Sequence, residues 1–173
     1  MPKLRCAIVA ILSIGISGVS QPASAQSDRH SAAESSIEAR LRQIQDREEI
    51  RALLIDYGRH FDARDFGAYS NLFAQDGTWI GSGSETRFTG PAAIRRMVEE
   101  GFPPEFYPGS FHIMTSISVE LTGADSATAW SRWTFMVRND EGTPVPLRAG
   151  RYEDVLVRVD GQWKFQQRQV LAD

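Results

Sequence analysis

Apolar residues recur at helical spacing between Asp46 and Asp62. Five of them fall on one side of a helix and predict that this side is buried along its length: Ile50, Leu53, Leu54, Tyr57 and Phe61. The stretch Asp62-Ala63-Arg64-Asp65 breaks the period, and Asp65 is placed to cap a second short helix. We expect that second helix to carry Phe66, Tyr69, Leu72 and Phe73.

A third helix is predicted after a turn-rich segment and a short strand around Thr86 to Phe88. It opens at Thr89-Gly90-Pro91 and ends at Gly101, and between them Ala93, Ile94, Met97 and Val98 have helical spacing. The segment Phe102 to Pro108 holds three prolines, so it fits neither a helix nor a central strand. Its aromatic residues Phe102, Phe106 and Tyr107 are typical of a loop that lines a pocket.

From Ser110 onward the hydrophobic period changes to two. A long strand is predicted with one apolar side, formed by Phe111, Ile113, Thr115, Ile117, Val119 and Leu121. Three further strands follow across turns, at 127–138, 147–159 and 162–171, and complete a four-stranded antiparallel meander. Helices followed by a long twisted sheet predict an α+β fold, a cone-shaped α+β barrel with the N-terminal helices in the concave side of a curved, mainly antiparallel sheet.

The N-terminus has the pattern of a secretory signal peptide. Lys3 and Arg5 precede an apolar run, and Ala23-Ser24-Ala25 is a small-residue cleavage site, so we expect residues 1–25 to be removed on export to the periplasm or medium. Residues 26–38 are interpreted as a flexible leader and residues 39–173 as one domain. The mature chain would keep no cysteine, because the only one, Cys6, lies in the apolar run.

Charge narrows the possible partners. Without Lys3 and Arg5 the chain has 17 basic and 22 acidic residues, a net charge of −5. This mild acidity argues against nucleic acid or an anionic membrane surface as the partner of the mature form.

The motif order resembles a known family, the SnoaL-like branch of the nuclear-transport-factor-like α+β cone proteins. The resemblance covers Ala39 to Val170 and rests on YGRHFDARDFGAYSNLF, DGTW, TGPAAIRRM, FHIMTSISVEL and AGRYEDVLVRVDGQWKFQQRQV. The superfamily hosts isomerases, dehydratases, dehydrohalogenases, other lyases and many non-enzymes, so the fold alone implies little about the reaction.

The resemblance to scytalone dehydratase-like and dehydrochlorinase-like members implies an Asp/His pair. An aspartate at the end of the first helix and a histidine at the start of the first long strand match Asp62 and His112. Scytalone dehydratase has a second active-site histidine on the following strand, where this sequence has apolar residues such as Val137. This departure argues against dehydration as the reaction and leaves the Asp/His pair intact.

The residue types at these positions also allow acid-base catalysis by an Asp/His pair. His112 lies on the polar side of its predicted strand between Phe111 and Ile113, where a neutral imidazole can act as a base near pH 7 and Asp62 would orient it. A solvent-facing histidine, or one satisfied by the backbone, is the alternative. Tyr57 is a candidate donor to a developing oxyanion, with an ordinary core tyrosine as its alternative.

Further candidates would bind the substrate. The aromatic pocket residues are Trp79, Phe88, Phe102, Phe106, Tyr107, Trp130 and Trp133. Arg151 and Tyr152 are neighbours on one strand, so one of them must face inward, while Arg132 competes to bind an anionic group. We predict no metal, because His60, Asp62 and Asp65 do not share a helix side, and no cofactor, because no phosphate-binding glycine motif is present.

Two classes of function fit these residues. The first is a cofactor-independent lyase that acts on a small, largely apolar, aromatic molecule, with His112 as base, Asp62 as its partner and Tyr57 assisting. The alternative is a non-catalytic exported module that binds a small ligand, and a proton-shuttling isomerase with Asp62 as base is a third possibility. An uncovered apolar side of the sheet also predicts a homodimer or a higher homo-oligomer.

Overall fold

The computed structural model describes residues 23–83, 85–103 and 105–173, and for residues 23–30 only the backbone. The chain divides into two units, Met1–Ala39 and Arg40–Asp173. The described part of the first unit is helical, and the second unit holds the sheet and the core. Most of the predicted signal peptide lies outside the described residues. Within the described part, no helix has both the length and the apolar character needed to cross a membrane.

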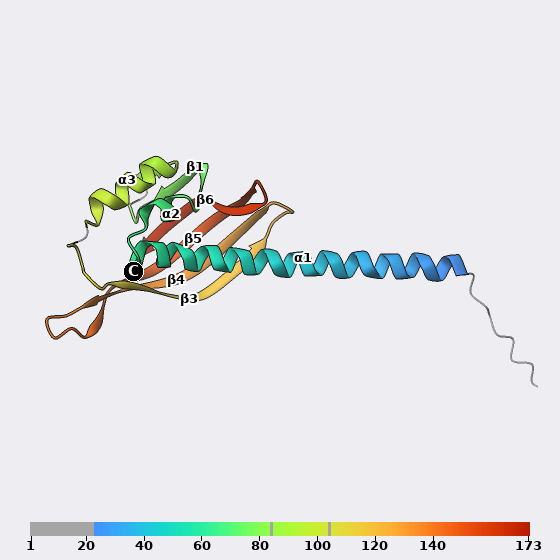
Figure 1. Ribbon diagram of the computed structural model, residues 1–173, viewed down its shortest axis with the longest axis horizontal. Helices are drawn as coiled ribbons and strands as arrows, with labels where there is room; N and C mark the ends of the chain where they lie inside the picture. Colours follow the sequence, from blue (N-terminus) through green and yellow to red (C-terminus); the bar gives the residue numbers. More distant parts are fainter. Residues whose placement is uncertain (1–22, 84, 104) are drawn as a thin grey trace, which may run out of the picture. The chain divides into compact units, whose positions relative to one another are not determined.

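The element order is that of an α+β protein. Its members are α1 (Ala23–Asp62), α2 (Phe66–Ser70), β1 (Phe73–Ile80), β2 (Arg87–Thr89), α3 (Pro91–Gly101), β3 (Phe111–Leu121), β4 (Ser126–Arg138), β5 (Pro144–Val159) and β6 (Gln162–Ala172). The six strands form one sheet in the order β2-β1-β6-β5-β4-β3 (Figure 1). The predicted meander β3 to β6 is confirmed, and β1 adds to it by parallel pairing with β6. The curved sheet is not closed into a barrel, since β2 and β3 are its edges.

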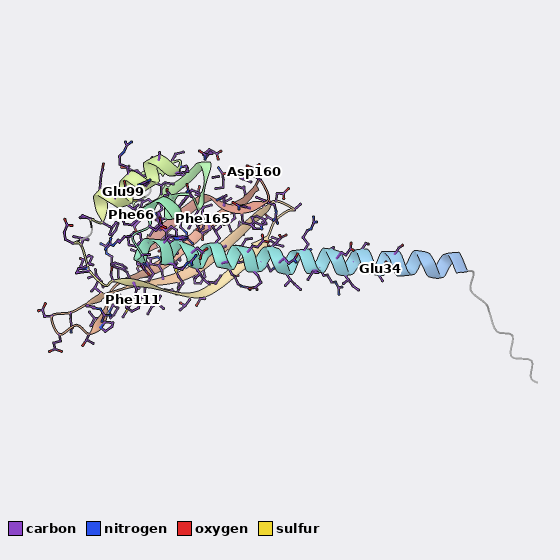
Figure 2. All side chains as sticks on the ribbon, viewed as in Figure 1. Glu34, Phe66, Glu99, Phe111, Asp160 and Phe165 are labelled. Carbon is purple, nitrogen blue, oxygen red and sulfur yellow. The ribbon has the colours of Figure 1, made fainter. Side chains whose placement is uncertain are left out.

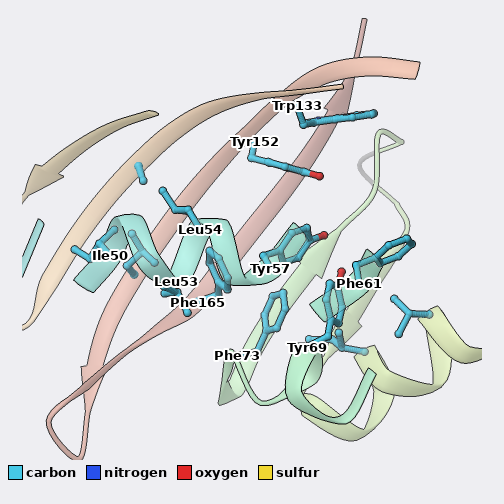
Figure 3. Packing of buried hydrophobic residues seen from close by; sticks show 14 of the residues in the cluster. Ile50, Leu53, Leu54, Tyr57, Phe61, Tyr69, Phe73, Trp133, Tyr152 and Phe165 are labelled. Atoms are coloured by element: carbon cyan, nitrogen blue, oxygen red, sulfur yellow. The ribbon is translucent and has the colours of Figure 1, made fainter. Parts of the chain in front are cut away.

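The C-terminal part of α1 packs on the inner side of this sheet. Ile50 and Leu54 are fully buried, and Figure 3 shows them with Tyr57 facing the strands that carry Tyr152 and Phe165. Each buried aliphatic side chain of this kind stabilises the fold by about 1.5–3 kcal/mol. The predicted buried side of this helix is therefore confirmed. Packing of this side against the sheet fixes where the end of the helix, at Asp62, lies.

Two element boundaries differ from the sequence prediction. The second helix ends at Ser70, and Phe73 begins β1 instead of continuing the helix. Asp65 caps α2 as expected, because its side chain accepts a hydrogen bond from the Ala68 N–H at 2.9 Å. At the N-terminus the described backbone is helical from Ala23, whereas the sequence was interpreted as a flexible leader up to residue 38.

Strand β3 does not keep one apolar side along its length. The pairing of β3 with β4 shifts register between Thr115 and Ser118, and Ser116 has a φ of 53°, which marks a β-bulge. After the bulge Ile117 and Val119 pack against the core, but before it Ile113 is 41% exposed. The extra residue reverses which side chains face inward, so the predicted alternation was wrong for the first half of the strand.

Candidate active site

Asp62 and His112 form a hydrogen-bonded pair. Asp62 ends α1, and His112 is the second residue of β3. The distance from His112 Nδ1 to Asp62 Oδ1 is 2.7 Å, and Asp62 Oδ2 accepts a hydrogen bond from the His112 backbone N–H at 2.8 Å. Because a carboxylate only accepts, we assign the proton of the neutral ring to Nδ1, which leaves a lone pair on Nε2. One side chain therefore fixes the position, orientation and tautomer of the imidazole.

The bulge in β3 explains why His112 faces inward. Its side chain is 9% exposed, and its ring lies 5.0 Å from the Phe61 ring and 4.9 Å from the Phe135 ring, measured between centroids. Gly58 on α1 lets the helix approach closely, since a Cβ there would lie 3.3 Å from the His112 Cβ. The solvent-facing alternative for this histidine does not describe the structure.

Arg64 ties the aromatic loop to the end of α1. It follows Asp62 in a tight turn with a φ of 59°, and its guanidinium donates to the Phe102 carbonyl at 2.9 Å and to the Phe106 carbonyl at 2.6 Å. The loop is thereby held beside the Asp/His pair. Sequence reasoning missed this role, because nothing in the local pattern indicates which carbonyls an arginine will reach.

His112, one member of the pair, lines a cavity of about 640 Å³. Eight predicted site residues line this cavity: Tyr57, Trp79, Phe102, Phe106, Tyr107, His112, Trp133 and Tyr152. Gly150 makes room for one of them, because a Cβ there would lie 2.8 Å from the Trp133 ring. The prediction that the irregular loop after α3 lines a pocket is confirmed by the positions of its three aromatic residues.

Tyr57 lies in the buried part of the cavity. Its hydroxyl oxygen accepts a hydrogen bond from Trp79 Nε1 at 2.9 Å. Burial raises the pKa of Tyr57, an effect that Arg168 and the hydrogen bonds with Tyr69 and Trp79 partly offset. A neutral phenol in this position can donate its proton to an oxygen or to a leaving group in the cavity.

Beneath Tyr57 lies a fully buried ion pair between Arg168 and Asp154, which the sequence did not reveal. Two parallel hydrogen bonds of 2.8 Å join them across β5 and β6. The Arg168 guanidinium carbon lies 4.0 Å from the Tyr57 ring centroid and 4.1 Å from that of Tyr152. Burial raises the pKa of the Asp154 carboxyl, and Arg168 opposes this shift. The ion pair therefore holds the Arg168 guanidinium against the rings of Tyr57 and Tyr152, two of the tyrosines that line the cavity.

Four predicted binding residues lie outside the cavity lining: Phe88, Trp130, Arg132 and Arg151. Phe88 packs against the Trp79 ring, with 6.0 Å between the ring centroids. Arg132 forms an ion pair with Asp173 at 2.8 Å and Arg151 one with Glu153 at 3.1 Å, and each arginine side chain is at least 39% exposed. These two arginines are paired across β4 and β5 on the outer side of the sheet, because Tyr152 takes the inward position.

Another arginine, Arg148, lines the cavity instead. The pairing of β4 with β5 shifts register here, since Phe135 pairs with Arg148 and Met136 with Pro146. This bulge brings both Leu147 and Arg148 to the cavity, although neighbours in a regular strand point to opposite sides. Strict alternation therefore could not indicate that Arg148 lines the cavity.

Metal ligands do not gather in the described part of the chain. No group of three His, Cys, Asp or Glu side chains there is arranged to hold a metal ion. The chemistry that the site can support with its own residues is proton transfer by His112, oriented by Asp62, beside a phenol.

Fold and site together define a small α+β cone protein whose cavity is bordered by an Asp/His pair. The chain belongs to the SnoaL-like domain family, whose model matches residues 42–169. A comparison with curated protein sequences finds no match.

Similar solved structures support this assignment. An NTF2-like protein with a cystatin-like fold from Novosphingobium aromaticivorans is 28% identical, with a TM-score of 0.73, over 80% of this chain and 88% of that one. A putative scytalone dehydratase from the same organism is 24% identical, with a TM-score of 0.67, over 76% and 87% of the two chains. A hexachlorocyclohexane dehydrochlorinase (LinA) Type2 is 22% identical, with a TM-score of 0.67, over 77% and 88%. At these last two identities the likeness shows the fold alone.

Proposed function

We propose that this protein is a cofactor-independent lyase that acts on a small, largely apolar, aromatic molecule. The observation that carries the proposal is the 2.7 Å hydrogen bond between Asp62 and His112 at the border of an aromatic cavity. Names of structural neighbours, a putative scytalone dehydratase and a dehydrochlorinase, support elimination chemistry as the reaction class.

The proposed reaction is an elimination. His112 Nε2 takes a proton from a substrate carbon, the C–H electron pair forms the new double bond, and the leaving group departs with its own bonding pair. Asp62 stabilises the imidazolium that forms, and Tyr57 donates a hydrogen bond to the developing negative charge. In this scheme a halide leaves directly as the anion, and a hydroxyl leaves as water when it takes a proton from Tyr57.

The geometry disfavours Asp62 as the base of an isomerase. Both of its oxygens already accept hydrogen bonds from His112, and Asp62 is not among the residues that line the cavity. A carboxylate whose two oxygens are engaged in this way and that lies outside the cavity lining has no access to the substrate.

The test is a substrate screen followed by two variants. Halogenated and hydroxylated aromatic and alicyclic compounds are incubated with the protein, and loss of substrate is followed by gas chromatography with mass detection. We expect His112→Ala and Asp62→Asn to lose turnover while their circular dichroism spectra stay unchanged. A double variant that keeps wild-type turnover would refute the proposal, and ligand binding with no turnover of any compound would favour a binding module.

Export is part of the same proposal. Expressed with its own N-terminus in a Gram-negative host, the protein should appear in the periplasm with Gln26 as its first residue. Intact mass spectrometry checks this, and an unprocessed protein in the cytoplasm would contradict it.

A further inference from the structure

Arg148 is the one permanently charged side chain among the residues that line the cavity. The lining includes no aspartate and no glutamate, so no carboxylate there competes for this cation. Within the described ranges, Arg148 has no ion-pair partner, whereas Arg132 and Arg151 on the outer side each have one. A guanidinium offers five N–H donors and no acceptor, which suits an oxygen-rich anionic group.

The sheet places Arg148 at a fixed position relative to the proposed base. His112 pairs with Phe135 across β3 and β4, and Phe135 pairs with Arg148 across β4 and β5. Residues directly paired in this way point to the same side of a sheet and lie about 5 Å apart, so the Cα atoms of His112 and Arg148 are about 10 Å apart. Both residues line the cavity, so one small molecule within it can contact both side chains.

A second donor in the cavity lacks an acceptor. Trp133 lines the cavity and is 6% exposed, and its indole Nε1 has no hydrogen-bond partner among the described residues. An indole N–H only donates, and a buried donor without a partner is costly. Arg148 and the Trp133 indole are both donors that a hydrogen-bond acceptor on the bound molecule would satisfy.

We propose that the substrate carries an oxyanion, a carboxylate or an ionised phenol, on its apolar body. Arg148 binds the charged oxygen, Trp133 donates to an oxygen of the same molecule, and the ring lies among the aromatic residues with one C–H directed to His112. This inference rests on the proposed function, because it defines the substrate class of the same cavity.

Paired probes test the charge requirement without turnover. Binding of 2-naphthoate and of its neutral analogue 2-naphthylmethanol is measured by isothermal titration calorimetry. The background is His112→Gln, so that the imidazole adds no charge. Arg148→Gln removes the cation, Arg148→Lys keeps a charge, and Arg132→Gln is the matched control, an exposed arginine outside the cavity lining.

We expect 2-naphthoate to bind about tenfold tighter than the alcohol, as for a charge-assisted hydrogen bond. Arg148→Gln should abolish this preference, Arg148→Lys should retain part of it, and Arg132→Gln should leave it unchanged. Equal binding of the two probes, binding of neither, or a preference that survives Arg148→Gln would overturn the inference. A failure of the proposed function can be told apart from a failure of this inference. The proposed function is tested by the loss of turnover in the His112 and Asp62 variants, whereas this inference is tested by the affinity of the probes.

Discussion

The substitution Asp62→Asn tests how the carboxylate controls His112. In the wild type both carboxylate oxygens accept hydrogen bonds, one from the ring Nδ1 and one from the backbone N–H. A carboxamide has a single acceptor oxygen and an amino group that only donates. If the oxygen keeps the backbone N–H, the amino group faces the ring and Nδ1 must become an acceptor. The proton then moves to Nε2, the nitrogen that has to accept the substrate proton.

The size of the effect follows from the lost interactions. A hydrogen bond to a charged group is worth about 1.5–3 kcal/mol, which is about tenfold to 150-fold in rate when it is lost from the imidazolium. Inversion of the tautomer adds to this, and the same change in a Ser-His-Asp triad lowers kcat by about 10⁴. We therefore expect turnover by Asp62→Asn to fall by about 10²- to 10⁴-fold.

Nitrogen NMR of labelled histidine reads the tautomer directly and needs no substrate. The wild type should show His112 protonated on Nδ1, and Asp62→Asn should show it protonated on Nε2, with the signal assigned by its absence in His112→Gln. Asp65→Asn is the matched control, because Asp65 caps α2 and asparagine caps helices about as well. An Nε2–H ring in the wild type, or an unchanged tautomer in Asp62→Asn, would refute the reasoning.

Three further predictions concern the core and the sheet. Arg168→Met should cost about 3–5 kcal/mol in urea unfolding, because Asp154 is left buried without its partner. Loss of Arg168 raises the native pKa of Asp154 further above its unfolded value, so the variant should lose more stability than wild type as the pH rises above about 4, the ordinary pKa of an aspartate; a pH-independent difference would contradict this. Tyr57→Phe leaves the Trp79 N–H without an acceptor and should cost about 1–3 kcal/mol, and an unchanged unfolding midpoint would argue against that hydrogen bond. We expect a homodimer in light scattering that Ile113→Lys weakens, since Ile113 is 41% exposed on the sheet; a wild-type monomer at micromolar concentration would refute it.

The sequence predicted the structure correctly wherever a helix or strand kept a single hydrophobic period along its length. The buried side of α1, the capping role of Asp65 and the order of the strands from β3 to β6 all follow from spacing and turn residues. The contact between Asp62 and His112 came from family resemblance, since 50 positions separate them. No local pattern could have joined the two.

The prediction from sequence was wrong where a β-bulge interrupted the two-residue alternation of a strand. At Ser116 no glycine, proline or asparagine marks the irregularity, so strict alternation assigned His112 to the wrong side of β3. Alternation left Arg151 and Tyr152 open as the inward residue, and Tyr152 takes that position, but it could not indicate Arg148, which reaches the cavity through the bulge in β5. The ion pair between Arg168 and Asp154 was missed because charged residues in a strand are normally expected on the outer side.

The bulge at Ser116 divides β3 into two segments that do different work in the protein. The segment before it positions His112, and the segment after it supplies Ile117 and Val119 to the core. Substitutions that tune the reaction through the segment before Ser116 can therefore leave the core contacts of Ile117 and Val119 in place. Deletion of that single residue would merge the two segments, so that the histidine or the core residues would have to face solvent. The length of this strand is thus under tighter constraint than the identity of most of its side chains.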